Sequence, residues 1–116
     1  MQDKLYHGVA YYPELWPIEA VGEDIRQMKL VGINCVRMGE FAWAKMEPNQ
    51  DEIDLSFFVG IIHRLHENGV DTVFCTPTPT PPIWLSHGHP ERMHVDSQGR
   101  VMSHGARQHF CGISVL

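Results

Sequence analysis

Residues 54–76 decide the fold, and they read DLSFFVGIIHRLHENGVDTVFCT. Apolar side chains recur every three or four residues over the first half, at Leu55, Phe58, Val59, Ile62 and Leu65. This period predicts an amphipathic helix, with Asp54 as its N-cap and Gly69 as its C-terminal stop. Residues 70–76 are short, apolar and β-favouring, as in a strand. The stretch therefore predicts a helix that leads directly into a strand.

The same pattern occurs earlier in the chain. A helical period is set by Ile18, Val21, Ile25, Met28 and Val31. Gly32 follows as a stop, and residues 33–39 have the character of a second strand. Residues 5–12 form another candidate strand, which Pro13 ends. Alternating strands and helices at this spacing predict an α/β fold, with parallel strands joined by right-handed crossovers.

Length and composition limit the class of protein. The chain has 116 residues, of which 43% are hydrophobic, and its net charge is −5. The apolar fraction suffices for a core, and the mild acidity argues against nucleic acid or an anionic membrane surface as a partner. No apolar run reaches the roughly 18–20 residues that span a bilayer. Residues 1–5 show no basic-then-apolar leader and three cysteines are too few for a disulfide framework, so we expect a cytoplasmic protein.

A long loop follows the third predicted strand. Residues 76–82 hold four of the eight prolines, which predicts a stiff, extended segment because proline fixes φ and lacks an N–H donor. A helical turn is expected at residues 83–85, and residues 96–99 are typical of the tip of a small hairpin. Connections this long in compact domains are usually functional.

Aromatic and acidic side chains follow the predicted strand ends, where parallel sheets place their sites. They are Glu14 and Trp16, then Glu40 and Trp43, then Trp84. Such a set suits a polar ring ligand, although the tryptophans could equally seal the end of the sheet. Arg37 lies in an apolar strand. It either reaches water from an edge or terminal position, or it holds a carboxylate such as Glu40 or Glu14 ionised.

Histidine and cysteine raise the question of a metal. Five of the eight histidines fall between residues 87 and 109, close to Cys111. Imidazole and thiolate suit zinc, but the spacings match no standard zinc motif, which favours histidines scattered over a solvated loop. Cys35 and Cys75 lie in predicted strands and are most simply small buried residues.

The order of these motifs closely resembles the amino-terminal part of glycoside hydrolase family 42, the β-galactosidases. The resemblance covers residues 5–111 and is lost over residues 112–116. It rests on Tyr11-Tyr12-Pro13-Glu14-Leu15-Trp16-Pro17, Val36-Arg37-Met38-Gly39-Glu40-Phe41-Ala42-Trp43 with Glu47-Pro48, Leu65-His66-Glu67-Asn68-Gly69, Thr76-Pro77-Thr78, Thr80-Pro81-Pro82 with Trp84-Leu85, and Arg107-Gln108-His109-Phe110-Cys111. Pro79 and Cys75 depart from the alanine and glycine common in the family.

This resemblance implies the first three βα units of a truncated TIM (β/α)8 barrel. Residues 1–116 would form a partial catalytic domain with a long third loop at 76–111. The family hydrolyses terminal β-D-galactosides with retention, uses two glutamates at the ends of its fourth and seventh strands, and needs no cofactor for the chemistry. The chain stops before the fourth strand, so we assign it no catalytic residue and expect it to be inactive alone. The full-length family member is expected to be a homotrimer.

The resemblance also implies roles for individual residues. Arg107 matches the arginine that contacts galactose, and Arg37 matches the one that orients the nucleophile. Together with Glu40 and Trp43 at the second strand end, they are the expected substrate-binding set. Cys111 matches the first of four cysteines that hold a structural zinc in some members. The alternative functions are a galactoside-binding or zinc-binding module without catalysis.

Overall fold

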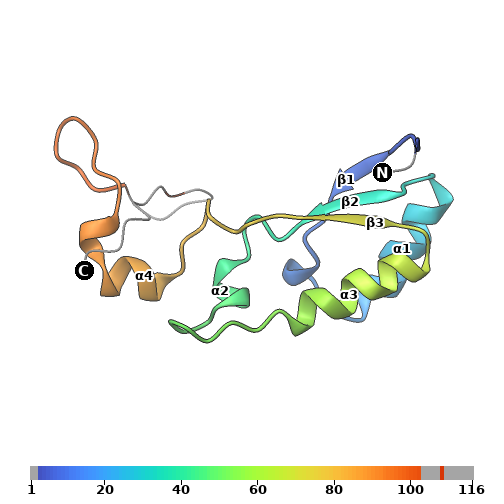
Figure 1. Cartoon of the computed structure of the whole chain (residues 1–116), viewed down its shortest axis with the longest axis horizontal. Helices are drawn as coiled ribbons and strands as arrows, with labels where there is room; N and C mark the ends of the chain where they lie inside the picture. Colours follow the sequence, from blue (N-terminus) through green and yellow to red (C-terminus); the bar gives the residue numbers. More distant parts are fainter. Residues whose placement is uncertain (1–2, 103–107, 109–116) are drawn as a thin grey trace. The chain divides into compact units, whose positions relative to one another are not determined.

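Three short strands form a parallel sheet in the order β1-β2-β3, as the computed structural model shows for residues 3–102 and 108, which it describes (Figure 1). The strands are β1 (Gly8–Ala10), β2 (Cys35–Met38) and β3 (Asp71–Phe74). Val36 of the central strand pairs with Val9 on one side and Thr72 on the other. The predicted α/β class with parallel strands is therefore confirmed.

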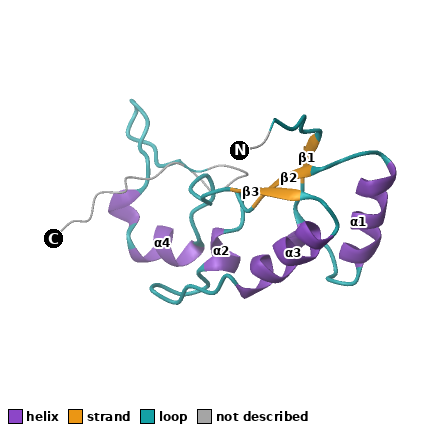
Figure 2. Ribbon diagram, turned by 45° about the vertical axis from the view of Figure 1, so that its right-hand side comes forward, coloured by secondary structure: helices purple, strands orange, loops and turns teal. Residues whose placement is uncertain are grey.

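Helices occupy the connections between the strands (Figure 2). The first crossover contains η1 (Pro13–Leu15) and α1 (Ala20–Leu30), and the second contains α2 (Trp43–Met46) and α3 (Ser56–Glu67). After β3 come α4 (Ile83–Gly88) and η2 (Pro90–Arg92). The two long helices and α4 lie where the sequence predicts them, whereas η1, α2 and η2 are too short to give a periodic signal.

Both long helices end as predicted, and one begins later. The φ angles of Gly32 and Gly69 are each 77°, in the left-handed region where glycine carries no steric cost. Beyond α3, the Val70 N–H donates to the Leu65 carbonyl at 2.9 Å, the bond of a Schellman cap. The N-cap of α3 falls on Leu55 rather than on Asp54.

Asp54 belongs to the loop that precedes α3. The backbone N–H of Asp54 donates to the Met46 carbonyl at 2.8 Å, which holds Asp54 in the preceding loop.

The chain divides into two compact units. The first consists of Met1–Gly39 and Leu55–Cys75, and the second consists of Glu40–Asp54 and Thr76–Leu116. The first unit thus holds the sheet with α1 and α3, and the second holds α2, α4 and η2.

The core of the first unit lies between one sheet face and the two long helices (Figure 2). Val36 and Met38 of the central strand are 0% exposed, as is Phe58 of α3. The Phe58 ring also packs against Phe74, with ring centroids 5.4 Å apart. The opposite sheet face is open, because Arg37 and Val73 are both exposed there.

The second unit contains the predicted hairpin. Asp96 N–H donates to the Arg100 carbonyl at 2.9 Å, and Met102 N–H donates to the His94 carbonyl at 2.9 Å. The sequence predicted an extended proline-rich stretch. This is wrong at residues 77–80, where the Thr80 N–H donates to the Pro77 carbonyl at 3.2 Å and closes a turn. A type I or II turn accepts proline, so four prolines do not prevent it. None of the helices in the described part is long and apolar enough to cross a membrane.

Candidate functional site

The carboxyl ends of the three strands lie together at one edge of the sheet. In the register of the strands, Arg37 lies between Ala10 and Val73. The ladder continues one step further, because the Tyr11 N–H donates to the Arg37 carbonyl at 2.8 Å. Ligands of open α/β sheets bind outside this edge, so each of the segments that follow the strands is a candidate for functional residues.

Arg37 projects from the open face of the central strand. A shallow pocket of about 250 Å³ lies there, lined by Gly8, Val9, Ala10, Cys35, Val36 and Arg37. Gly8 allows β1 to lie close to β2 beneath this pocket, because a Cβ at this position would lie 2.9 Å from the Cys35 carbonyl oxygen. Arg37 therefore reaches the solvent-accessible face from a central strand and not from an edge strand. Its role in binding substrate stays a prediction.

Tyr11 fixes the end of β1 onto α1. Its side chain is buried, and its hydroxyl donates to Asp24 Oδ2 at 2.9 Å. Burial is the main cause that raises the pKa of Tyr11 above its usual range, and the hydrogen bond to Asp24 is the second cause. The tyrosine is therefore a neutral phenol that ties the strand end to the helix. The sequence analysis gave it no such role, because the partner lies 13 residues away.

Glu47 joins three segments of the second unit. Its Oε2 accepts a hydrogen bond from Trp43 Nε1 at 2.8 Å, and its Oε1 accepts one from the Asp51 backbone N–H at 3.0 Å. Its carbonyl oxygen accepts a third from Trp84 Nε1 at 2.8 Å. Two of the three tryptophans thus meet at one residue, to which the sequence analysis gave no role beyond its place in the motif Glu47-Pro48. The i, i+4 spacing of Trp43 and Glu47 is the signal that could have identified it.

The other predicted residues of these segments are placed as follows. Glu40 comes directly after Gly39, whose φ of 91° turns the chain at the end of β2. Glu40 is buried, with 8% exposed, and Trp43 is half-buried. Trp16 belongs to the first unit and is 65% exposed. Substrate binding by Glu40 and Trp43 stays a prediction.

Arg107 and Cys111 lie outside the described residues. Gln108, which stands between them in the sequence, is buried. Its backbone N–H donates to the Pro79 carbonyl and its Nε2 donates to the Met102 carbonyl, both at 2.7 Å. Gln108 therefore links the proline-rich loop, through Pro79, to the end of the hairpin, through Met102.

The described part of the chain shows no cluster of metal-ligating side chains. Among residues 3–102 and 108, no three histidine, cysteine, aspartate or glutamate side chains gather as metal ligands. Cys35 and Cys75 are half-buried free thiols, in β2 and directly after β3. Cys111 is outside the described residues, and zinc binding by this residue stays a prediction.

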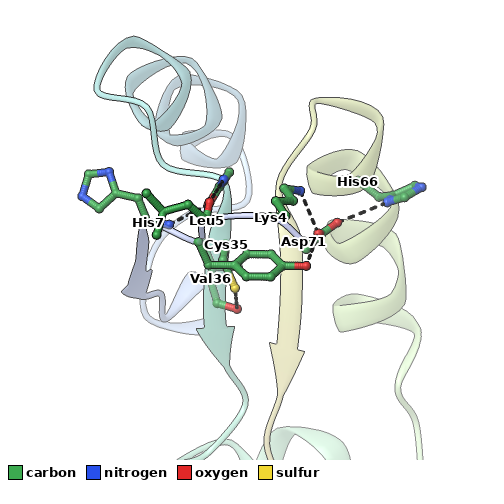
Figure 3. Close-up of polar contacts among 9 residues, drawn as sticks. Lys4, Leu5, His7, Cys35, Val36, His66 and Asp71 are labelled. Atoms are coloured by element: carbon green, nitrogen blue, oxygen red, sulfur yellow. Dashed lines mark hydrogen bonds and ion pairs between the residues drawn. The ribbon is translucent and has the colours of Figure 1, made fainter. Parts of the chain in front are cut away.

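A polar cluster at the opposite edge of the sheet is structural (Figure 3). Asp71, at the start of β3, accepts hydrogen bonds from Lys4 Nζ at 3.0 Å and from the Tyr6 hydroxyl at 3.2 Å. His66 Nδ1 lies 3.9 Å from the same carboxylate. The hydrogen bond from Lys4 is the main cause that holds the pKa of Asp71 below its usual value. The cluster fastens the N-terminal segment to the start of β3, away from the carboxyl ends of the strands.

The chain matches one protein family over most of its length. Residues 10–116 match the glycoside hydrolase family 42 model, described as β-galactosidase. This match extends to residue 116, so the expectation that the resemblance ends at residue 111 is wrong. The chain is 59% identical over 111 residues to the β-galactosidase YesZ of Bacillus licheniformis, and 44% identical over 104 residues to a β-galactosidase of Thermus thermophilus.

These matches cover 96% and 90% of this chain but only 17% and 16% of the two relatives. Solved structures agree. The β-galactosidase of Halorubrum lacusprofundi superposes with a TM-score of 0.85 at 38% identity, and that of Rahnella sp. R3 with 0.86 at 30% identity. Each superposition covers 92% of this chain and 16% of the other. The chain thus spans about one sixth of the length of the proteins it matches.

Proposed function

Because this chain belongs to the glycoside hydrolase family 42 β-galactosidases, we propose that it builds the first three βα units of the catalytic barrel in a retaining β-galactosidase. The substrate class is a β-D-galactoside with a terminal, non-reducing galactose. The observation that carries the proposal is the parallel β1-β2-β3 sheet, which superposes on solved β-galactosidases with TM-scores of 0.85 and 0.86.

The chain contributes substrate binding rather than bond cleavage. A retaining glycosidase needs two carboxyl groups about 5–5.5 Å apart across the scissile bond, one as acid/base and one as nucleophile. In this family both come from later strands, so no residue of this chain is assigned to either step. Arg37 and Arg107 would bind the sugar by charged hydrogen bonds, Glu40 would accept from a hydroxyl, and Trp43 would stack on the ring.

Three finer proposals accompany this function. Cys111 would be one ligand of a structural zinc that plays no part in the chemistry. The complete enzyme would assemble as a homotrimer, and it would act in the cytoplasm. Zinc content, the mass of the assembly in solution and cell fractionation test the three separately.

A binding function without catalysis is the second candidate. It is supported by the two indoles that Glu47 holds in one unit, because anchored aromatic rings are suited to a sugar without any catalytic carboxylate. Calorimetric titration of the isolated chain with galactose separates it from the first candidate. Heat of binding at millimolar sugar would favour the module. A zinc-binding module would instead require stoichiometric zinc in the purified chain, lost on Cys111→Ser.

A chimera tests the main proposal. This chain replaces the matched segment of the Bacillus licheniformis β-galactosidase, to which it is 59% identical. We expect the chimera to hydrolyse a chromogenic β-galactoside, whereas the same relative with the segment deleted should not. A chimera that folds to the size of its parent but hydrolyses nothing contradicts the proposal.

A further inference from the structure

We propose that the outer edge of β3 and the adjoining side of α3 form a docking surface that binds the rest of a family 42 barrel as a separate polypeptide. The partner is a second chain that supplies a strand parallel to β3 and a helix that packs beside α3. This inference rests on the proposed function and goes beyond it, because it assigns to this chain an assembly between two polypeptides.

The outer edge of β3 is open to a further strand. Over residues 3–102 and 108, the strand order is β1-β2-β3, so β3 pairs on one side only. Val73 and Phe74 of this strand are 54% and 39% exposed. Strands of parallel sheets are normally covered on both faces, and an open edge presents backbone N–H and C=O groups to another strand. The edge is therefore suited to a neighbouring parallel strand.

A pocket of about 450 Å³ lies beside this edge, between α3 and β3. Its lining includes Ile62, His63 and His66 of α3, and Asp71 and Thr72 of β3. Val59 precedes Ile62 by three residues, so it lies on the same side of α3, and it is 47% exposed. The apolar surface of α3 thus extends beyond the face that packs on the sheet. A helix placed beside β3 would bury Val59 and Ile62.

One polar atom at this pocket lacks a partner. Thr72 Oγ1 is buried, and no group in the described part of the chain forms a hydrogen bond with it. A buried hydroxyl without a partner is unfavourable, because it has given up its hydrogen bonds to water. A polypeptide seated in the pocket that Thr72 lines can supply the missing bond.

Solved structures point to the kind of polypeptide that fits. Only 16% of each of the β-galactosidases of Halorubrum lacusprofundi and Rahnella sp. R3 superposes on this chain. In those proteins the matched segment belongs to a much longer chain, and a closed barrel leaves no strand edge free. The rest of such a barrel therefore has a strand and a helix of the right kind. A second copy of this chain is the competing occupant.

Binding at this surface needs no peptide bond to the partner. The strand edge and the pocket are built from Tyr6, α3 and β3, which all belong to the first compact unit. Strand pairing and the burial of apolar side chains are non-covalent interactions. The surface is therefore complete within this chain, and a separately supplied barrel remainder can bind it.

Co-expression tests the proposal. This chain, with an affinity tag, is produced together with the Bacillus licheniformis β-galactosidase that lacks its matched segment, and the covalent chimera is produced in parallel. We expect the untagged remainder to co-purify in equimolar amount. The pair should hydrolyse a chromogenic β-galactoside at no less than about one tenth of the rate of the chimera, in which the link raises the effective concentration. An active chimera whose remainder does not co-purify overturns the inference and leaves the proposed function intact.

Two matched variants locate the surface. Val59→Lys places a charge beside β3, whereas Leu30→Lys places one on α1, where Leu30 is 67% exposed and lines a different pocket. Both positions lie outside the core, so both variants should fold like the parent. We expect Val59→Lys to lower the yield of co-purified remainder about tenfold, and Leu30→Lys to change it less than twofold, because only the first buries a charge on docking. Equal yields for the two variants overturn the inference.

An inactive chimera would count against the proposed function and not against the docking surface, since co-purification without hydrolysis still supports docking. If the remainder is insoluble when co-expressed, the two chains are unfolded in urea and refolded together. A mixture that yields no complex on size exclusion overturns the inference. Dimers of this chain in place of the mixed complex also overturn it, and they would identify a second copy as the occupant.

Discussion

Adding one methyl group at Gly8 should weaken the sheet, although the same change at Gly60 should strengthen the protein. Gly8 pairs with Cys35 across β1 and β2, and a Cβ there would lie 2.9 Å from the Cys35 carbonyl oxygen and 3.3 Å from the Cys35 Cβ. Real Cβ atoms do not approach backbone oxygen so closely. The two strands must therefore separate, at a cost of about 1–3 kcal/mol for overpacking.

Gly60 is the matched control. It lies within α3, is exposed, and its Cβ would meet no atom within 4 Å. Gly60→Ala should stabilise the helix by about 0.5–1 kcal/mol, because alanine loses less backbone entropy than glycine on folding. The two variants differ from the parent by the same CH2 group and should shift stability in opposite directions.

Urea unfolding of the chimera, followed by circular dichroism, measures both changes at constant protein concentration. Hydrogen exchange of the β1 and β2 amides shows whether the loss at Gly8→Ala is local. We expect a lower midpoint and faster exchange in these strands for Gly8→Ala, and a higher midpoint for Gly60→Ala. Shifts of the same sign, or unchanged exchange at Gly8→Ala, would refute the close approach of β1 to β2.

Three other predictions concern the first unit and the isolated chain. Tyr11→Phe should cost about 1–2 kcal/mol in urea unfolding, because it leaves Asp24 without the phenol that donates to it at 2.9 Å. Asp71, whose pKa Lys4 lowers, stabilises the fold above the ordinary carboxyl range and loses this effect as the pH falls below about 4, so Asp71→Asn should flatten that part of a stability–pH profile. A profile that Asp71→Asn leaves unchanged would exclude this linkage. The isolated chain should unfold broadly and bind a hydrophobic dye, because Val73 and Phe74 on β3 are 54% and 39% exposed; a sharp transition without dye binding would contradict this.

The regular part of the fold could be predicted because its signals are local. The apolar period over residues 18–31, and again over 55–65, marks a buried helix face, and Gly32 and Gly69 mark the ends. The short elements could not be predicted, because three or four residues show no period. The helix begins one residue later than predicted, with Leu55 in place of Asp54 as its N-cap; the Asp54 N–H donates to the Met46 carbonyl, a contact that no sequence pattern reports.

The sequence predicted which types of side chain lie in the candidate segments, but it did not predict which of them contact one another. The sequence placed Trp43 and Trp84 after strand ends, but only the structure shows both indoles on Glu47. Glu47 and Trp84 are 37 residues apart, and this separation hides their contact from local pattern analysis. Arg37 was recognised as unusual because a charge in an apolar strand needs an explanation. Its position on the open face of the central strand depends on strand order, which is a tertiary property.

The value of kcat/KM for the chimera with the Bacillus licheniformis relative tests the central claim most directly. If this chain supplies the first three βα units of a retaining β-galactosidase, the chimera should hydrolyse a β-galactoside within about tenfold of its parent, and NMR should show β-galactose as the first product. A folded chimera of the parent's size that releases no galactose, or that releases α-galactose first, would contradict the claim.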